Sequence, residues 1–459
     1  SFANTTLFDE NHTYEAFVNF LEVTGPYDVV HFDSTEGVPL SCLAAPKRVW
    51  PQAQVTLYCH NYHSVCPQVN LWHDESSNCL DFRNGEKCVS CLPIRPKPDE
   101  VVDAYRLSWL LRQNHITPGT RRYGVAYRGY GAIRSRPGAF RLARRAVELA
   151  RSPSKAIPDP IRGKLAIDHH AGARHGEPIV LLPSDTSALH DAGGAAPDAV
   201  DDERNTDGTG VSIAGSRLGE RNRFRDRRVR STELINTHID RVLATSHRTA
   251  EVLEKFGVAH DKIQVCYLGT EAAGSADPAE RRYDRLDEDS LTIGYLGYLR
   301  RDKGFYFLLD ALERAPDSLL ARLRLVIAAV LHDEEVVERL TLLKERMQAI
   351  VLYDGYHHDQ LGEILGRIDL GVIPVLWEDN LPQVAIEMVS AGLPLLTSDL
   401  GGAQELGGNN PAFVFEAGQA ESLHQRLGAI ADRRVELGRY WDQAMTPVTM
   451  SAHLEALDA

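Results

Sequence analysis

The sequence predicts an α/β protein with two doubly wound parallel sheets, and three observations carry this prediction. From about residue 291 onward, short apolar runs alternate with helical patterns, and the connections between them are short. The apolar runs are nearly continuous, as in strands of a parallel sheet whose two faces are both covered by helices. The first 270 residues show the same alternation less completely. We therefore expect two Rossmann-like domains facing each other across a cleft, with the N-terminal one incomplete.

The second half contains six expected strands with helices between them. The helical patterns cover 304–315 and 334–350, and the most apolar helix lies within 375–402. The apolar runs that we expect to be strands are 291–297, 323–330, 349–355, 370–375, 394–399 and 412–417.

The first half contains four expected strands, at 27–32, 54–60, 241–246 and 262–269. A helix-like stretch precedes the first strand and another helix separates the last two. The chain starts at Ser1 without a methionine, and its first clear strand already lies behind the helix-like stretch. Either the sequence is a fragment, or the front sheet is smaller than usual.

A long polar stretch interrupts the first half. Residues 165–230 are rich in Gly, Asp, Arg, Ser and Pro, and we expect a mobile insertion because they offer little apolar surface to bury. Upstream, 138–151 is a basic amphipathic helix, which either packs on the domain or contacts a membrane surface. The expected divisions are an N-terminal domain over 1–270, a C-terminal domain over 271–435 and a helical tail over 436–459.

Composition narrows the class of protein. The chain has 459 residues, 43% of them hydrophobic, and a formal net charge of −14. Such an acidic chain is not expected to bind nucleic acid. No run of 18 apolar residues and no signal-peptide pattern is found, so we expect a cytoplasmic protein with at most peripheral membrane contact.

The helix within 375–402 carries an unexpected charge. It is apolar nearly all round, yet Glu387 lies in its middle, where an unpaired carboxylate is costly. Asp379 precedes it by eight positions, beside Asn380 and Pro382, which suit a helix cap and a first turn. Both carboxylates could face one hydroxyl-rich ligand. Alternatively, Glu387 pairs with a basic neighbour and Asp379 is only a cap.

Two further loops follow strands at the same edge of the sheet. In the loop 297–304, Lys303 with Arg300 or Arg301 could neutralise a diphosphate, and Gly304 permits close backbone approach. The loop 398–405 contains Gly401 and Gly402. Ligands bind at the carboxyl ends of such strands, so three loops there predict a ligand site.

The second half resembles the donor domain of glycosyltransferase family 4, whose members are retaining enzymes of the GT-B fold. The stretch GYLRRDKGFYFLLDAL is similar to its glycine-basic-lysine-glycine opening, and residues 353–406 run collinearly with its core signature. The resemblance implies that Asp379 contacts the donor sugar and that Glu387 holds the ribose hydroxyls. It implies an active-site histidine at His60, after the second strand. The other donor-binding positions that it implies are Gly297, Gly304, Asn380, Leu381, Pro382, Gly401 and Gly402.

The resemblance implies transfer of a sugar from a nucleotide-diphosphate donor to a hydroxyl of a glycan or lipid-linked acceptor. His60, Lys303, Arg300, Arg301 and Asp379 would form the catalytic set, without a catalytic metal or other cofactor. This chain departs from the family pattern at Tyr298, where an arginine is usual. The alternative is therefore a catalytically degenerate nucleotide-sugar-binding protein.

Four cysteines form a separate motif. Cys66, Cys79, Cys88 and Cys91 follow the His60 strand in the spacing C-x12-C-x8-C-x2-C, which resembles a subset of the family. Four thiolates would close a structural zinc site with no open position for catalysis. Reduced thiols and a disulfide remain the alternatives. A nucleic-acid-binding zinc module is not favoured, because few basic residues follow the cluster.

Overall fold

The computed structural model describes residues 11–36, 38–74, 76–91, 179–181, 212–273, 290–331, 333–433 and 435–458. The basic helix expected at 138–151 and most of the stretch 165–230 lie outside these residues. All ten strands expected from the apolar runs are present, each within or close to its expected range.

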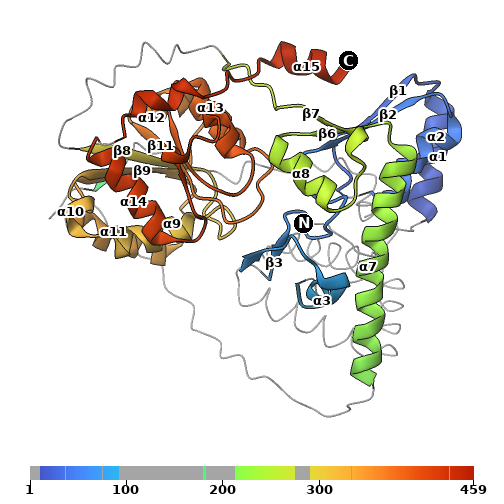
Figure 1. Ribbon diagram of the computed structural model, residues 1–459, viewed down its shortest axis with the longest axis horizontal. Coiled ribbons are helices and arrows are strands. Elements are labelled where there is room, and N and C mark those ends of the chain that lie inside the picture. Colours follow the sequence, from blue (N-terminus) through green and yellow to red (C-terminus); the bar gives the residue numbers. More distant parts are fainter. Residues whose placement is uncertain are drawn as a thin grey trace, which may run out of the picture. The chain divides into compact units, whose positions relative to one another are not determined.

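The first half forms a parallel sheet in the order β1-β2-β6-β7 among the described residues (Figure 1). Val55, Leu57 and Val242 from its two middle strands are fully buried. The strands are β1 (Val29–Phe32), β2 (Gln54–Cys59), β6 (Arg241–Ala244) and β7 (Ile263–Val265). The helices are α1 (Asn11–Thr24), α2 (Ala45–Val49), α7 (Ser212–His238) and α8 (His247–Lys255).

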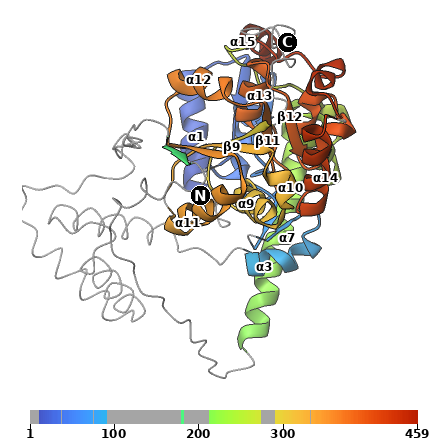
Figure 2. The same cartoon turned by 90° about the vertical axis from the view of Figure 1, so that its left-hand side faces the viewer.

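A small irregular layer follows β2. It consists of the hairpin β3 (Trp72–His73) and β4 (Ser77–Asn78), and of α3 (Glu86–Cys91). Helix α3 contacts both α7 and β3, and both views show it beside α7 (Figures 1 and 2). The cysteine motif lies in this layer.

The expected mobile insertion at 165–230 is wrong for its described parts. Strand β5 (Ile179–Leu181) pairs antiparallel with β10, and α7 begins at Ser212. The polar composition of this stretch did not reveal the helix, because α7 packs on the domain through only a narrow face. Phe224 and Ile235 on that face are buried, while arginines cover the exposed side.

The second half is a seven-stranded sheet in the order β13-β12-β11-β8-β9-β10-β5, in which every strand but β5 is parallel. Its strands are β8 (Leu291–Leu296), β9 (Leu323–Ala329), β10 (Ala349–Asp354), β11 (Leu370–Ile373), β12 (Leu395–Ser398) and β13 (Val414–Phe415). Its helices are α9 (Phe305–Arg314), α10 (Asp317–Leu320), α11 (Glu334–Leu343), α12 (Leu361–Gly366), α13 (Gln383–Ser390) and α14 (Ala420–Ala431).

The strand order of this sheet contains a switch point. The chain runs from β8 outward to β9 and β10, and then returns to the other side of β8 to form β11. Connections therefore leave β8 and β11 in opposite directions and open a crevice beyond their carboxyl ends. Three-residue to six-residue 3-10 turns join the elements, at Leu40–Ala44, Arg83–Gly85, His260–Lys262, Lys344–Arg346, His358–Gln360, Ala403–Gly407, Pro411–Phe413 and Leu437–Asp442.

The C-terminal tail ends in α15 (Met450–Asp458), which packs on the sheet of the first half. The ring of His453 is 2.9 Å from the Tyr267 carbonyl oxygen, and Leu457 joins a cluster around Tyr58. In the part of the chain that the structure describes, no helix combines the length and apolarity needed to cross a bilayer.

Candidate active site

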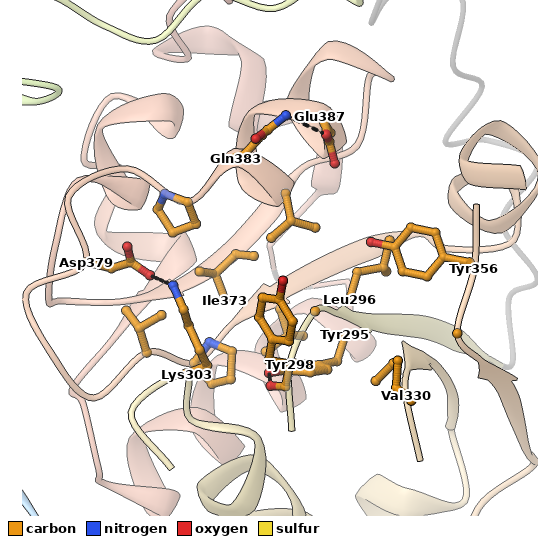
Figure 3. Close-up of a pocket in the computed structure, with 18 residues that line it drawn as sticks. Tyr295, Leu296, Tyr298, Lys303, Val330, Tyr356, Ile373, Asp379, Gln383 and Glu387 are labelled. Carbon is orange, nitrogen blue, oxygen red and sulfur yellow. Dashed lines mark hydrogen bonds and ion pairs between the residues drawn. The ribbon is translucent and has the colours of Figure 1, made fainter. Parts of the chain in front are cut away.

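A cavity of about 530 Å³ opens at the switch point of the second sheet. It is bounded by the carboxyl ends of β8, β9, β10 and β11 and by the first turns of α13 (Figure 3). Its floor is apolar. The polar side chains that line it are Tyr295, Tyr298, Lys303, Tyr356, Asp379, Gln383 and Glu387.

Asp379 and Lys303 form an ion pair inside this cavity. The Lys303 Nζ lies 2.6 Å from Asp379 Oδ2 and 5.1 Å from the centre of the Trp377 ring. Burial raises the pKa of Asp379, and the positive charge of Lys303 opposes that shift. The carboxylate and the ring together hold the ammonium group at one position in the cavity wall.

Glu387 reaches the same cavity from α13. Gln383, one turn earlier, donates its Nε2 to Glu387 Oε1 at 3.2 Å, as Figure 3 shows. Burial raises the pKa of Glu387, while His358 and the Gln383 hydrogen bond oppose the shift. Among the described residues no lysine or arginine forms an ion pair with Glu387, so the alternative of a basic partner has no support there.

The expected cap of this helix is wrong. Helix α13 begins at Gln383, its N-cap residue is Pro382, and no side chain caps it. A proline disfavours helical backbone in the residue before it, so the helix cannot extend back to Asp379 or Asn380. The Asp379 carboxylate pairs with Lys303 and does not cap the helix. The start of the helix is uncapped, and it lines the cavity with Pro382, Gln383 and Val384.

The four glycines expected at the donor site differ in position and in structural role. Gly297 lines the cavity. Gly304 precedes α9 with φ of 77°, and a Cβ there would lie 1.6 Å from the Pro374 carbonyl oxygen. Gly401 and Gly402 are not lining residues. The amide of Gly402 donates to the Asp379 carbonyl at 2.8 Å, so this loop supports the segment that presents Asp379.

The two arginines of the first loop point elsewhere. Arg300 forms a two-bond pair with buried Asp302, at 2.9 and 2.5 Å. Arg301 stacks over the Tyr306 ring at 5.6 Å. Neither lines the cavity, where Lys303 is the only lysine or arginine of the described lining and Tyr298 stands in the usual arginine position.

His60, Asn380 and Leu381 also lie outside the lining of this cavity. His60 follows β2 and is exposed, with its ring centre 4.1 Å from that of Tyr58. Leu381 is a core residue. Asn380 is buried and donates its Nδ2 to the carbonyl of Cys59, the residue before His60, at 3.2 Å. This bond connects the Asp379 segment with the end of the expected histidine strand.

Sequence reasoning missed two buried acids beside the site. Glu378, which is fully buried, accepts two hydrogen bonds from Arg248, at 2.6 and 2.8 Å, and one from Asn78 at 2.9 Å. Asp302 anchors Arg300. The stretch Trp377-Glu378-Asp379 contains adjacent acids, and nothing local in the sequence shows which one faces the cavity.

The four cysteines of the motif gather in the layer after β2. All seven cysteines of the chain are unlinked thiols. Over the described ranges, no three Cys, His, Asp or Glu side chains are placed to hold one metal ion between them. The zinc site therefore remains a prediction.

The fold and cavity define an α/β protein with a polar-lined cavity at the carboxyl edge of a parallel sheet. Residues 290–433 match the sequence model of a family described as glycosyl transferases group 1. This match contains the whole cavity.

Curated relatives point to the same class. The chain is 24% identical over 189 residues to Bacillus subtilis TuaC, whose name refers to a teichuronic acid biosynthesis glycosyltransferase; the alignment covers 40% of this chain and 45% of that protein. It is 25% identical over 163 residues to a lipopolysaccharide 1,2-N-acetylglucosaminetransferase of Salmonella typhimurium, covering 33% of this chain and 42% of that protein. The chain thus matches less than half the length of either relative.

Among solved structures, Anabaena Alr3699/HepE in complex with UDP-glucose is similar, with 17% identity and a TM-score of 0.39 over 51% of this chain and 66% of that one. A TM-score of 0.39 indicates only partial structural similarity. The fold assignment therefore rests on the strand order of the two sheets.

Proposed function

We propose that this protein is a retaining glycosyltransferase, which moves a sugar from a nucleotide-diphosphate donor to a hydroxyl of a glycan or lipid-linked acceptor. The single observation that carries the proposal is the convergence of Lys303, Asp379 and Glu387 on one cavity at the switch point of a parallel sheet. The match of residues 290–433 to a glycosyltransferase family supports the reaction class. The names of the two relatives support glycan assembly as the context.

The leaving diphosphate would bind at the cationic end of the cavity. Lys303 supplies a positive charge there, and the uncapped first turn of α13 supplies the positive end of a helix dipole. Fixed positive groups stabilise negative charge that develops on a departing phosphate without any reorganisation. Asp379 keeps the Lys303 ammonium in place and would accept hydrogen bonds from the donor sugar.

The nucleoside would bind along α13. Glu387, which forms no ion pair with a lysine or arginine in the described chain, is a suitable acceptor for the two hydroxyls of a ribose. His60, at the end of β2, would lie toward the transferred sugar or the acceptor, as the family resemblance implies. The reaction would use no separate protein base, because the leaving phosphate can take the proton of the acceptor hydroxyl.

Calorimetry with UDP and GDP tests the donor site. We expect one of the two nucleotides to bind the wild-type protein and Glu387→Ala to weaken that binding at least tenfold. Glu363→Ala is the matched control, because this exposed glutamate on α12 pairs with Arg367 in the next turn and does not line the cavity. Absence of binding to both nucleotides, or equal binding by the two variants, would refute the assignment of the cavity.

A second candidate function is nucleotide-sugar binding without turnover. The specific observation in its favour is the pairing of Arg300 with Asp302, which leaves Lys303 as the cation of the described lining. Incubation of the protein with radiolabelled UDP-sugars and a panel of glycan acceptors separates the two functions. Transfer of label, with an α-linked product from an α-linked donor, supports the retaining enzyme. Donor binding without transfer or hydrolysis supports the second function.

A further inference from the structure

Two loops contribute the ion pair of the cavity, and each carries a buried acid immediately before its charged residue. Asp302 precedes Lys303 and is buried. Glu378 precedes Asp379 and is fully buried. Neither acid lines the cavity, so their carboxylates do not act on a ligand directly. The groups that bind these acids therefore decide how firmly the two loops are held.

Asp302 connects the two loops with each other. Its Oδ1 accepts the Lys303 amide at 3.1 Å, and its backbone carbonyl accepts the Leu376 amide at 2.9 Å. The same carboxylate also holds Arg300 through two bonds. Because Leu376 begins the segment that leads to Asp379, a shift of Asp302 would displace both members of the ion pair.

Asn70, from the loop that follows β2, binds this acid. Its Nδ2 donates to Asp302 Oδ2 at 3.2 Å, and its own Oδ1 accepts the Trp72 amide at 3.3 Å. The second bond fixes the orientation of the side-chain amide and so directs its nitrogen toward Asp302. A hydrogen bond to a buried carboxylate is stronger than one between neutral groups in water.

The backbone on both sides of Asn70 is strained. Val69 has φ of 80° and Leu71 has φ of 52°, in the region that favours glycine. The Val69 carbonyl accepts the Tyr62 amide at 2.9 Å, which closes the loop. Such conformations persist only where the surrounding structure imposes them, and they gather at functional sites. Strain at both neighbours of one side chain indicates that this side chain is presented to a partner.

Asn78, on β4, binds the second acid. Its Nδ2 donates to Glu378 Oε1 at 2.9 Å. Its Oδ1 is buried and has no hydrogen-bond partner among the described residues. A buried amide oxygen without a partner costs stability, so stability alone does not explain an asparagine at this position. The bond to Glu378 gives the asparagine a purpose at the second loop.

We propose that Asn70 and Asn78 are positioning residues of the donor site, which hold its ion pair in the place where a diphosphate binds. This inference rests on the proposed function. The two asparagines act through the two buried acids and do not line the cavity themselves. The first half of the chain thereby sets the geometry of a site that the second half forms. A cation fixed before the ligand arrives stabilises phosphate charge without reorganisation.

Nucleotide binding tests the effect on the cation. We expect Asn70→Ala and Asn78→Ala each to weaken binding of the nucleoside diphosphate about threefold to tenfold, and to leave binding of the matching nucleoside unchanged. Asn236→Ala is the matched control, because this asparagine joins Gly257 and Ala259 within the first half. Calorimetry with UDP, GDP, uridine and guanosine measures all variants. Equal losses for nucleotide and nucleoside would show that the asparagines support the fold rather than the cation, and would overturn the proposal.

A double-mutant cycle with Lys303→Met separates positioning from general stability. If the asparagines act through the Lys303 ammonium, each alanine variant should weaken nucleotide binding less than about twofold once that ammonium is gone. Undiminished losses in the Lys303→Met background contradict the proposal. Should an alanine variant not fold, the serine variant at the same position replaces it.

Hydrogen exchange of the protein without ligand keeps this proposal distinct from the proposed function. We expect Asn70→Ala to speed exchange of the Lys303 and Leu376 amides, both of which donate to the acid that Asn70 binds. Asn78→Ala should speed exchange of the Gly401 amide, which donates to the other acid at 3.2 Å.

The combined outcomes are separable. Nucleotide binding by the wild type, with unchanged affinity and unchanged exchange in both variants, overturns this proposal alone. A wild type that binds neither UDP nor GDP refutes the proposed function. In that case faster exchange in both loops still supports the hold on the ion pair, and unchanged exchange overturns it.

Discussion

Single side chains in the cavity have separable tasks, and the ion pair of Lys303 with Asp379 illustrates this. Its two atoms are 2.6 Å apart, and Asp379 is 5% exposed. In the proposed donor site the Lys303 cation would act on phosphate oxygens, whereas Glu387 would act on the nucleoside. The two contributions can therefore be measured with different ligands.

We predict that Lys303→Met weakens UDP binding about tenfold or more and leaves uridine binding almost unchanged, because only UDP carries the phosphates that the ammonium attracts. Calorimetry with both ligands measures the difference. The double variant Lys303→Met/Asp379→Asn is the control for an unpaired buried carboxylate. An equal loss for UDP and uridine would show that Lys303 supports the shape of the cavity rather than the phosphates.

The raised pKa of Glu387 predicts a dependence on pH. A carboxyl group whose pKa is higher in the folded protein binds protons on folding, so its ionised form destabilises the native state at neutral pH. We expect Glu387→Gln to raise the free energy of unfolding at pH 7 by roughly 0.5–1 kcal/mol, because it removes a partly buried charge at a candidate functional position. Urea denaturation should show this gain shrinking as the pH falls through the pKa of Glu387. A gain that is constant over that range would mean that the charge is not its cause.

At the scale of elements, the start of α9 depends on Gly304. The loop from β8 turns there with φ of 77°, and the chain passes against the Pro374 carbonyl. This turn places Lys303 at the cavity and lets Phe305 and Leu308 enter the core in the first turn of α9. An L-residue at position 304 conflicts with both the dihedral angle and the contact.

We predict that Gly304→Ala destabilises the protein by about 3 kcal/mol or more, because a Cβ would meet the Pro374 oxygen at 1.6 Å in addition to the positive φ. Gly428→Ala, inside α14, is the matched comparison. A Cβ there meets nothing within 4 Å, so this change should stabilise by about 0.5–1 kcal/mol through helix propensity. Thermal unfolding measures both. If the two substitutions shift the melting temperature alike, the steric argument at Gly304 fails.

At the scale of the whole molecule, two buried glutamates of the second half, Glu378 and Glu405, bind groups from distant parts of the chain. Glu378 pairs with Arg248 of α8, and Glu405 accepts the amides of His247 and Arg248 at 2.9 and 2.7 Å. Arg248 therefore contributes both a side chain and a backbone amide to residues of the second half. Burial without these partners would leave the Glu378 carboxylate uncompensated.

We predict that Arg248→Met destabilises the protein by roughly 3–5 kcal/mol, because it leaves Glu378 buried and charged. Arg248→Met/Glu378→Gln should recover part of that loss, since the carboxylate is removed with its partner. A double-mutant cycle in urea measures the coupling between the two residues. Additive losses in the cycle would mean that the pair is not the source of the effect.

The sequence by itself determined the α/β class and the parallel sheets, because strand and helix periodicity record local burial. The runs at 291–297 and 370–375 are apolar at almost every position, and both became buried strands, β8 and β11. The spacing of Asp379 and Glu387 left two interpretations open, but three loops at one sheet edge predicted a ligand site there. The structure places both carboxylates in one cavity at that edge.

Only the tertiary structure decided which charges meet. Lys303 reaches Asp379 across 76 positions of sequence, and Arg300, its equal by local pattern, instead pairs with Asp302. The sequence could not exclude α7 as a mobile stretch, because among its described side chains only Phe224 and Ile235 are both apolar and buried. The energy of a charge depends on burial and on partners in space, and neither quantity is recorded by local periodicity.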